Sequence, residues 1–239
     1  MAEPSGTVPV PPPAPAGPPV TALIVAGGMG RRMNSPVPKQ FLTLRGKPVV
    51  QWALERFAGL PAVTDLVLVL PAGWLEEGRV RLAGFVPAQP FRLVEGGERR
   101  QDSVAAGLAA IGHEGWVAVH DGARPAVPAE VAAGAIAAAL RLGNAVCAVP
   151  AADTLVEAEA GIVQGDVPRD RVFQVQTPQV FPVALLRQAL DAARRDGVTG
   201  TDDAGLVRRL GVPIHLVPGS VRNLKVTRSE DLATLDALL

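Results

Sequence analysis

Residues 23–40 have the residue types of an anion-binding loop. They begin with a short apolar, β-branched run, pass through several glycines, and then bring Arg32 and Lys39. Glycine lets backbone N–H groups close around an anion because it takes the required turns without a Cβ penalty. Cations directly after the glycines indicate a highly charged anion, and therefore a polyphosphate such as that of a nucleotide. The glycines concerned are Gly27, Gly28 and Gly30.

The glycines alone leave the kind of nucleotide open. A dinucleotide-binding fingerprint requires glycine where this chain has Met33, and a P-loop requires a Gly-Lys-Ser/Thr sequence that is absent here. By itself, the stretch also fits an ordinary strand-to-loop turn with solvated arginines. Pro36 and Pro38 favour a site, because they stiffen the loop and can direct Arg32 and Lys39 toward one place.

Two other apolar runs end in residues that could contact a ligand. Gly96 and Gly97 follow one run and precede a helical pattern, and open α/β sheets bind ligands where a strand passes into a helix in this way. Asp121 follows another run, where it could organise a metal or a ligand hydroxyl, and Arg124 adds a phosphate partner. Simpler interpretations are a glycine entry to a helix with solvated Arg99 and Arg100, and a turn aspartate beside a surface arginine.

Bulk composition excludes several classes of partner. The chain has 239 residues, 48% of them hydrophobic, which is enough for a sizeable core. It has 23 basic and 23 acidic residues, so we expect no nucleic-acid or membrane partner, and we expect any phosphate site to be local.

The single cysteine, Cys147, favours a reducing, cytoplasmic location and is expected to be a small buried hydrophobe. Residues 1–20 are expected to be a disordered, proline-rich leader, neither signal peptide nor membrane anchor.

Apolar runs alternate with helical patterns along most of the chain. This alternation predicts an α/β fold of parallel strands joined by right-handed crossovers, in one domain over residues 21–239. At about residues 150–172 the pattern changes to short strands around Gly161, which predicts a protruding β-arm. A two-stranded ribbon is marginal alone, so a second subunit is its expected support. The expected strands are 64–70, 91–94, 116–120, 144–150, 214–217 and 223–227, and the expected helices are 48–57, 74–82, 99–108, 128–140, 183–195, 201–210 and one from 229.

Two kinds of polar residue have simple structural interpretations. Thr201 and Ser229 stand where they can cap the last two helices. His120 lies in an apolar strand without a second histidine or cysteine beside it, so we expect a hydrogen-bonded core residue rather than a catalyst.

Four motifs occur along the chain, namely AGGMGRRM with PKQ, EGGERRQDSV, VHDGARP, and TPQ followed by TDDA and NLKVT. In order and spacing they resemble the 2-C-methyl-D-erythritol 4-phosphate cytidylyltransferases of non-mevalonate isoprenoid biosynthesis. The resemblance covers nearly everything after the leader. It implies a Rossmann-like, mostly parallel mixed sheet flanked by helices, of the nucleotide-diphospho-sugar transferase type. It also implies a homodimer with the β-arm swapped onto the neighbouring subunit.

The resemblance implies a role for each matching residue. Arg32 and Lys39 match the transition-state stabilisers, and Arg169 and Lys225 match the residues that position the acceptor phosphate. The implied nucleotide contacts are Ala26, Gly27, Gly28, Gly30, Gly97, Glu98, Ser103 and Asp121. The implied contacts to the polyol phosphate are Asp121, Arg124, Arg169, Thr177, Thr201 and Lys225.

The chain departs from the family pattern twice. Gly27 stands where the family usually has a second alanine, and Glu98 stands where it usually has aspartate. Neither change removes a charged catalytic group, but the second bears on base selectivity.

The implied reaction suits these residue types. A phosphate monoester attacks the α-phosphorus of CTP and expels pyrophosphate. Because the second pKa of such a monoester is about 6, the nucleophile is already ionised at neutral pH and needs no general base. Arg32 and Lys39 would neutralise the α-phosphate, with Mg²⁺ held mainly by the CTP phosphates.

Other interpretations stay open at this point. A cytidylyltransferase for ribitol 5-phosphate, or another sugar-phosphate nucleotidyltransferase, would have the same kind of fold. A nicotinamide-dependent dehydrogenase is disfavoured by Met33, and a non-catalytic nucleotide sensor would have little use for cations around a second phosphate pocket.

Overall fold

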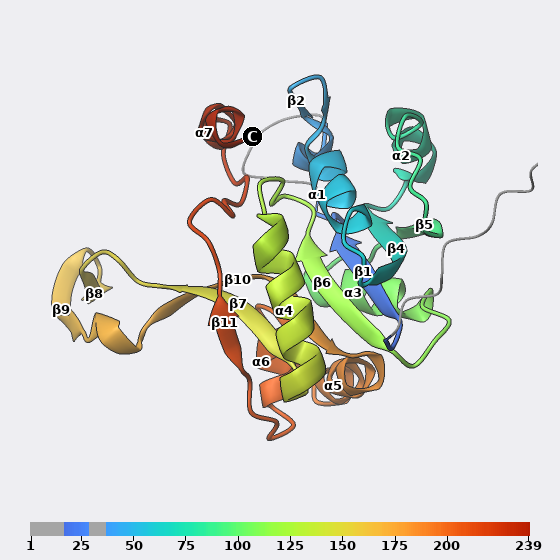
Figure 1. The fold of residues 1–239 in the computed structure, drawn as a ribbon. Coiled ribbons are helices and arrows are strands. Elements are labelled where there is room, and N and C mark those ends of the chain that lie inside the picture. Colours follow the sequence, from blue (N-terminus) through green and yellow to red (C-terminus); the bar gives the residue numbers. More distant parts are fainter. Residues whose placement is uncertain (1–16, 29–36) are drawn as a thin grey trace, which may run out of the picture.

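A seven-stranded sheet forms the centre of the molecule. The computed structural model describes residues 17–28 and 37–239. The strand order is β11-β7-β10-β6-β1-β4-β5, and β10 runs antiparallel to β6 and β7 while the other neighbouring pairs are parallel (Figure 1). The mostly parallel mixed sheet is therefore confirmed. Its strands are β1 (Val20–Val25), β4 (Val63–Leu70), β5 (Phe91–Glu95), β6 (Trp116–Asp121), β7 (Ala145–Pro150), β10 (Phe173–Pro182) and β11 (Leu216–Pro218).

Helices cover both faces of the sheet. One face carries α1 (Val49–Ala58) and α4 (Ala129–Leu142), and the other carries α3 (Arg100–Ala109), α5 (Val183–Arg195) and α6 (Asp203–Arg208) (Figure 1). The short helix α2 (Leu75–Arg81) follows β4, and α7 (Glu230–Leu238) closes the described chain. The smaller elements are η2 (Lys39–Phe41), β2 (Thr43–Leu44), β3 (Lys47–Pro48) and η3 (Arg169–Arg171).

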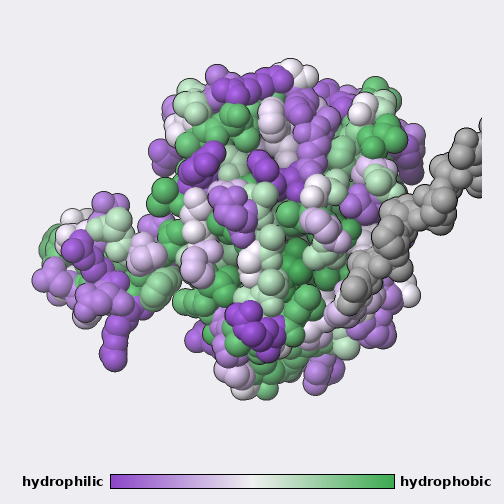
Figure 2. Space-filling model, in the orientation of Figure 1, coloured by the Kyte–Doolittle hydropathy of each residue, from purple (hydrophilic) through white to green (hydrophobic). Residues whose placement is uncertain are grey.

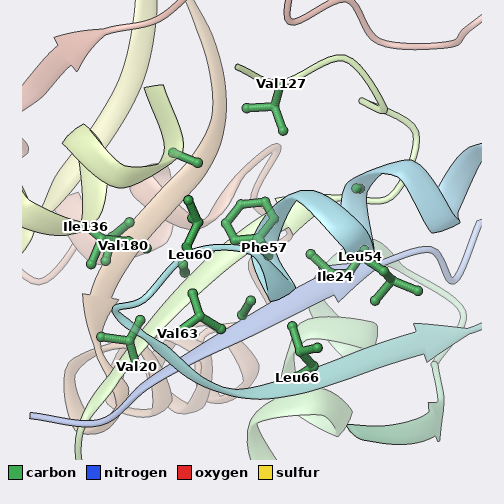
Figure 3. Packing of buried hydrophobic residues seen from close by; sticks show 14 of the residues in the cluster. Val20, Ile24, Leu54, Phe57, Leu60, Val63, Leu66, Val127, Ile136 and Val180 are labelled. Carbon is green, nitrogen blue, oxygen red and sulfur yellow. The ribbon is translucent and has the colours of Figure 1, made fainter. Parts of the chain in front are cut away.

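Side chains of strand β1 point alternately to the two faces of the sheet, and so contribute to the hydrophobic core on each face. Ala22 and Ile24 pack with residues of α1 and α4, whereas Leu23 and Val25 belong to the cluster under α3 and α5. All are almost completely buried, as expected for a central parallel strand covered on both sides. Figure 3 shows Phe57 of α1 at the centre of the first cluster, among aliphatic side chains from several elements.

The loops that follow the parallel strands meet at one edge of the sheet. Ala26 N donates to Val69 O, Gly96 N to Leu70 O, and Gly122 N to Val25 O, at 2.7–2.9 Å. Each bond joins the residue after a strand to the end of a neighbouring strand. The segments after β1, β5 and β6 are thereby fixed side by side.

The predicted β-arm is present. Strands β8 (Leu155–Glu159) and β9 (Ile162–Val167) pair antiparallel, and the turn between them places Ala160 and Gly161 at positive φ, 49° and 83°. The arm extends away from the sheet in Figure 1, and Figure 2 shows it as a lobe joined to the body by a narrow neck. Its apolar side chains Val156, Ile162 and Val163 are exposed.

Strand β10 was not predicted from the sequence. The segment contains Pro178 and three glutamines, so it lacks the continuous apolar pattern that predicts a buried strand. Its inner half, residues 176–181, is nevertheless buried, and Pro178 lies at the register shift between the two parts that pair with β7. Residues 223–227 were predicted to form a strand but do not, although Val226 N donates to Ala123 O at 2.8 Å.

The cap prediction for α6 was wrong by one residue, whereas the predicted cap position of α7 was correct. Asp202, not Thr201, is the N-cap of α6, and its carboxylate accepts from Gly205 N at 2.8 Å. Ser229 occupies the N-cap position of α7, as predicted, but its side chain makes no cap bond. Asp231 instead accepts from the backbone N–H of Thr227 and Arg228.

The predicted start of the domain is one residue late. Val20 already belongs to β1, and Pro19 O accepts from Trp116 N at 2.9 Å. Residues 1–16 of the predicted leader lie outside the described residues. Among the residues that are described, no helix is both long and apolar enough to cross a bilayer.

Candidate active site

Two adjoining clefts lie at the edge of the sheet where the loops meet. The first, the glycine cleft, is lined by the segments after β1 and β5 and by the start of α3. The second, the outer cleft, lies between β10, α6 and β11. The glycine cleft includes Ala26, Gly27, Gly28, Lys39, Gly97, Glu98 and Ser103, and the outer cleft includes Arg124, Thr177, Thr201, Asp202, Gly205 and Arg208. Arg100, Asp121 and Lys225 line both clefts.

Close packing explains two of the glycines. A Cβ on Gly27 would lie 2.5 Å from Ser103 Oγ, and a Cβ on Gly97 would lie 2.5 Å from Asp102 Cβ. Helix α3 therefore packs closely on both glycine segments: a side chain at Gly97 would displace the first turn of the helix, and one at Gly27 would have to move the Ser103 side chain. This approach places Ser103, predicted to contact the nucleotide, against the glycine loop.

Lys39 reaches the glycine cleft from the short helix η2. Its Nζ atom donates to Val226 O at 2.7 Å, which links the segment after the glycine loop to a segment 187 residues later. The neighbouring Gln40 is buried and donates to Ala26 O, so the end of β1 and η2 are held together. Arg32 and Gly30, also predicted site residues, lie outside the described residues.

The segment that carries Lys225 is fixed against β10. Asn223 is fully buried and donates to Thr177 O at 2.7 Å, while Arg124 Nη1 donates to Asn223 O at 2.6 Å. The hydroxyl of Thr177 lies 3.1 Å from Asp121 N, from which it accepts a hydrogen bond. The predicted residues Asp121, Arg124, Thr177 and Lys225 are thus brought to one place by contacts between three distant segments.

Asp121 is the electrostatic centre of the two clefts. Its Oδ2 accepts from Lys225 Nζ at 2.7 Å, its Oδ1 accepts from Arg100 Nε at 3.4 Å, and Arg124 Nε lies 3.7 Å away. Burial alone would raise the pKa of Asp121. The charge of Arg100, followed by those of Lys225 and Arg124, outweighs it and holds this pKa far below its usual range. Asp121 is therefore a permanent anion among cations.

Two charged residues of this cluster were not predicted. Arg100 was expected to be solvated, but its side chain is only 25% exposed and donates to Asp203 Oδ2 at 2.8 Å. Asp203 is completely buried, and this burial raises its pKa against the attraction of Arg100. The neighbouring Arg99 is exposed as expected and pairs with Asp102. A pairing between positions 100 and 203 leaves no local sequence signal.

Arg169 lies apart from the clefts of its own chain. It begins η3 at the base of the arm, where its Nη1 donates to Ala152 O at 2.9 Å, and it lines neither cleft. The single chain therefore does not bring Arg169 to Lys225. The other predicted residues within the described ranges, Thr201 and Glu98 included, line one cleft or the other.

His120 and Cys147 have the structural roles expected of them. His120 is fully buried, lies 3.0 Å from Thr177 Oγ1 and 3.1 Å from Arg124 O, and packs on Phe57. Burial lowers the pKa of His120 to about 4, so its ring is neutral at physiological pH. Burial likewise raises the pKa of the Cys147 thiol to about 12, which makes it unreactive.

The donor atoms of the site suit a divalent metal ion that is brought in by a phosphate ligand. In residues 17–28 and 37–239, no group of three or more His, Cys, Asp or Glu side chains is placed to hold a metal ion. Asp121 is already engaged by cations. A divalent ion at this site would depend on phosphate oxygens for most of its ligands.

The sheet is mostly parallel, with a glycine-lined cleft at its carboxyl edge and a second, cationic cleft beside it. Superposition on solved structures identifies this architecture as an α/β nucleotidyltransferase-like fold. A sequence model of the family described as IspD, 2-C-methyl-D-erythritol 4-phosphate cytidylyltransferase, matches residues 20–239. The chain belongs to this family.

Individual relatives agree with the family match. The 2-C-methyl-D-erythritol 4-phosphate cytidylyltransferase of Geotalea uraniireducens is 41% identical, over 92% of this chain and 96% of the relative. That of Symbiobacterium thermophilum is 43% identical, over 92% of this chain and 93% of the relative. The crystal structure of the enzyme from Thermus thermophilus is 36% identical and superimposes with a TM-score of 0.75, covering 91% of this chain and 97% of that one.

Proposed function

We propose that this enzyme transfers CMP from CTP to 2-C-methyl-D-erythritol 4-phosphate, releases pyrophosphate and forms 4-diphosphocytidyl-2-C-methyl-D-erythritol. The observation that carries the proposal is the family match over residues 20–239, which includes both clefts. The glycine cleft would bind CTP, and the outer cleft would bind the polyol phosphate. Lys39 lines the glycine cleft and Lys225 lines both clefts, so the two phosphates would approach each other between cations.

The attacking group needs charge stabilisation rather than a base. A phosphate monoester has a second pKa of about 6 and is ionised at neutral pH. The difficulty is repulsion between two polyanions, which Lys39 and Arg32 would relieve at the α-phosphate. The neutral, buried His120 fits this scheme, because no proton has to be removed from the nucleophile.

Lys225 would dock the acceptor phosphate. Its ammonium is held by Asp121 at 2.7 Å, and its side chain is 37% exposed. An incoming phosphate can therefore reach Lys225 while Asp121 keeps it in place. Thr177, Thr201 and Arg124 line the same cleft and would contact the hydroxyls and the phosphate of the acceptor.

Mg²⁺ is the proposed cofactor. It would be held mainly by the CTP phosphates, since Asp121 is engaged by three cations and Glu98 is the other carboxylate of the glycine cleft. When bound, Mg²⁺ would neutralise phosphate charge and favour departure of pyrophosphate.

The proposed enzyme is a homodimer joined by its arms. Support comes from the exposed apolar residues Val156, Ile162 and Val163 on a two-stranded arm, which is marginal alone. Arg169 at the arm base is remote from the clefts of its own chain and would complete the acceptor site of the other subunit. The buried, unreactive Cys147 is compatible with the proposed cytoplasmic location.

An acceptor assay tests the proposal. Purified protein is given CTP and Mg²⁺ with methylerythritol phosphate, ribitol 5-phosphate or a hexose 1-phosphate, and pyrophosphate release is measured. We expect release with methylerythritol phosphate, together with an equal amount of the cytidine diphosphate product. Faster release with ribitol 5-phosphate would reassign the acceptor, and no release with any acceptor would contradict an enzymatic role.

A further inference from the structure

Arg100 bridges two buried carboxylates at the wall between the clefts. It begins helix α3, donates to Asp203 at 2.8 Å through Nη2, and donates to Asp121 at 3.4 Å through Nε. The side chain of Asp121 is 10% exposed and that of Asp203 is fully buried. The guanidinium therefore joins the end of β6 to the start of α6.

The two carboxylates serve different parts of the site. Asp121 uses one oxygen for Arg100 and the other for Lys225. Asp203 is flanked by Asp202 and Ala204, which line the outer cleft, and Gln179 of β10 bonds to both of these neighbours. A shift of Arg100 would thus be transmitted to Lys225 on one side and to the wall of the outer cleft on the other.

We propose that Arg100 is a positioning residue for the transfer step, which fixes one oxygen of Asp121 so that the other oxygen holds Lys225 at the junction of the clefts. This inference rests on the proposed function. The planar fork of arginine suits the task, because separate nitrogens can point at two carboxylates, whereas a lysine ammonium is a single point charge. The competing role is structural, in which Arg100 only compensates the buried charge of Asp203.

A paired substitution separates the two roles. Arg100→Met alone leaves Asp203 buried without its cation, and we expect a loss of thermal stability. Adding Asp203→Asn removes this unpaired charge and keeps the net charge of the site unchanged. If Arg100 positions Asp121, the double variant Arg100→Met/Asp203→Asn regains most of the melting temperature but not the activity.

The expected kinetic signature is specific to the acceptor. In the double variant the KM for methylerythritol phosphate rises roughly tenfold or more and kcat falls, while the Kd for CTP, measured by calorimetry, stays within about threefold of wild type. Arg100→Lys, which preserves charge but not the fork, is expected to lie between wild type and the double variant.

Arg92 and Asp65 provide the matched control. They also form an ion pair with a mostly buried aspartate, but they lie on β5 and β4 and line neither cleft. Arg92→Met/Asp65→Asn should leave the KM and kcat of the enzyme unchanged.

Several outcomes would overturn the inference. Wild-type KM and kcat in the double variant would show that Arg100 only compensates Asp203. A weaker Kd for CTP with an unchanged acceptor KM would assign Arg100 to nucleotide binding instead. An inactive wild-type protein would contradict the proposed function and, with it, this inference.

Discussion

The cations of the clefts and the arginine of the arm are held in different ways. Lys39 and Lys225 are each fixed by a partner more than 100 residues away in the sequence, Val226 O and Asp121 respectively. Arg169 instead bonds to Ala152 O, 17 residues away on the same arm. The clefts are therefore ordered by the fold of one chain, whereas the position of Arg169 relative to a site depends on what the arm meets.

This difference separates two kinds of contribution to activity. In the proposed enzyme, residues of the body would act in the chain that carries them, where contacts within that chain already fix them. A residue of the arm would act only when two chains associate. Substitutions in the two regions should therefore impair the enzyme in different ways.

The largest effect is expected from the body. Lys39→Ala removes a cation from the glycine cleft, and we expect kcat to fall about 10²- to 10³-fold while CTP binding survives, because the charge is needed most in the transition state. Steady-state kinetics and calorimetry with CTP measure the two quantities. Lys47→Ala is the control, since Lys47 pairs with Glu55 and lines neither cleft. Normal turnover in Lys39→Ala would remove Lys39 from the mechanism.

The buried residue His120 should also make the stability of the body depend on pH. The pKa of His120 is lowered from its ordinary value of 6.5 to about 4, so the unfolded chain binds a proton more readily than the folded chain between these values. Stability therefore falls as pH drops from 6.5 toward 4, by about 3 kcal/mol in total from this group. Urea unfolding across this range measures the slope. His120→Asn should flatten it, and an identical slope in the variant would refute the assignment to His120.

A smaller effect is expected from the arm. Arg169→Ala should raise the KM for the acceptor phosphate roughly tenfold, as expected for loss of a hydrogen bond to a charged group, with little change in the Kd for CTP. Stability should change little, because the Arg169 side chain is exposed in the single chain. An unchanged KM would show that Arg169 does not dock the acceptor.

The sequence was most informative where the signal is local. The glycines of the first loop, the paired glycines before α3, and Asp121 at the end of β6 each adjoin an apolar run, so their position at the edge of the sheet could be predicted. The β-arm was likewise visible from its short strands and Gly161.

The sequence was least informative where partners come from distant segments. Arg100 was expected to be solvated because its partner Asp203 lies 103 residues later. At α6, two adjacent residues could serve as the cap, and only the backbone geometry selects Asp202 over Thr201. Strand β10 lacked an apolar run because its buried polar residues are satisfied by tertiary contacts, such as that of Gln179 with Ala204 N.

Mixing two impaired variants tests most directly the claim that body and arm complete one site between two chains. Arg169→Ala and Lys225→Ala proteins are unfolded together, refolded as a mixture, and assayed for CMP transfer. A dimer that contains one chain of each kind has one site with both cations intact and one site with neither. The account predicts that the mixture recovers about a quarter of wild-type turnover, as expected for random pairing in a two-fold dimer. No recovery above the separate variants would contradict a site shared between subunits.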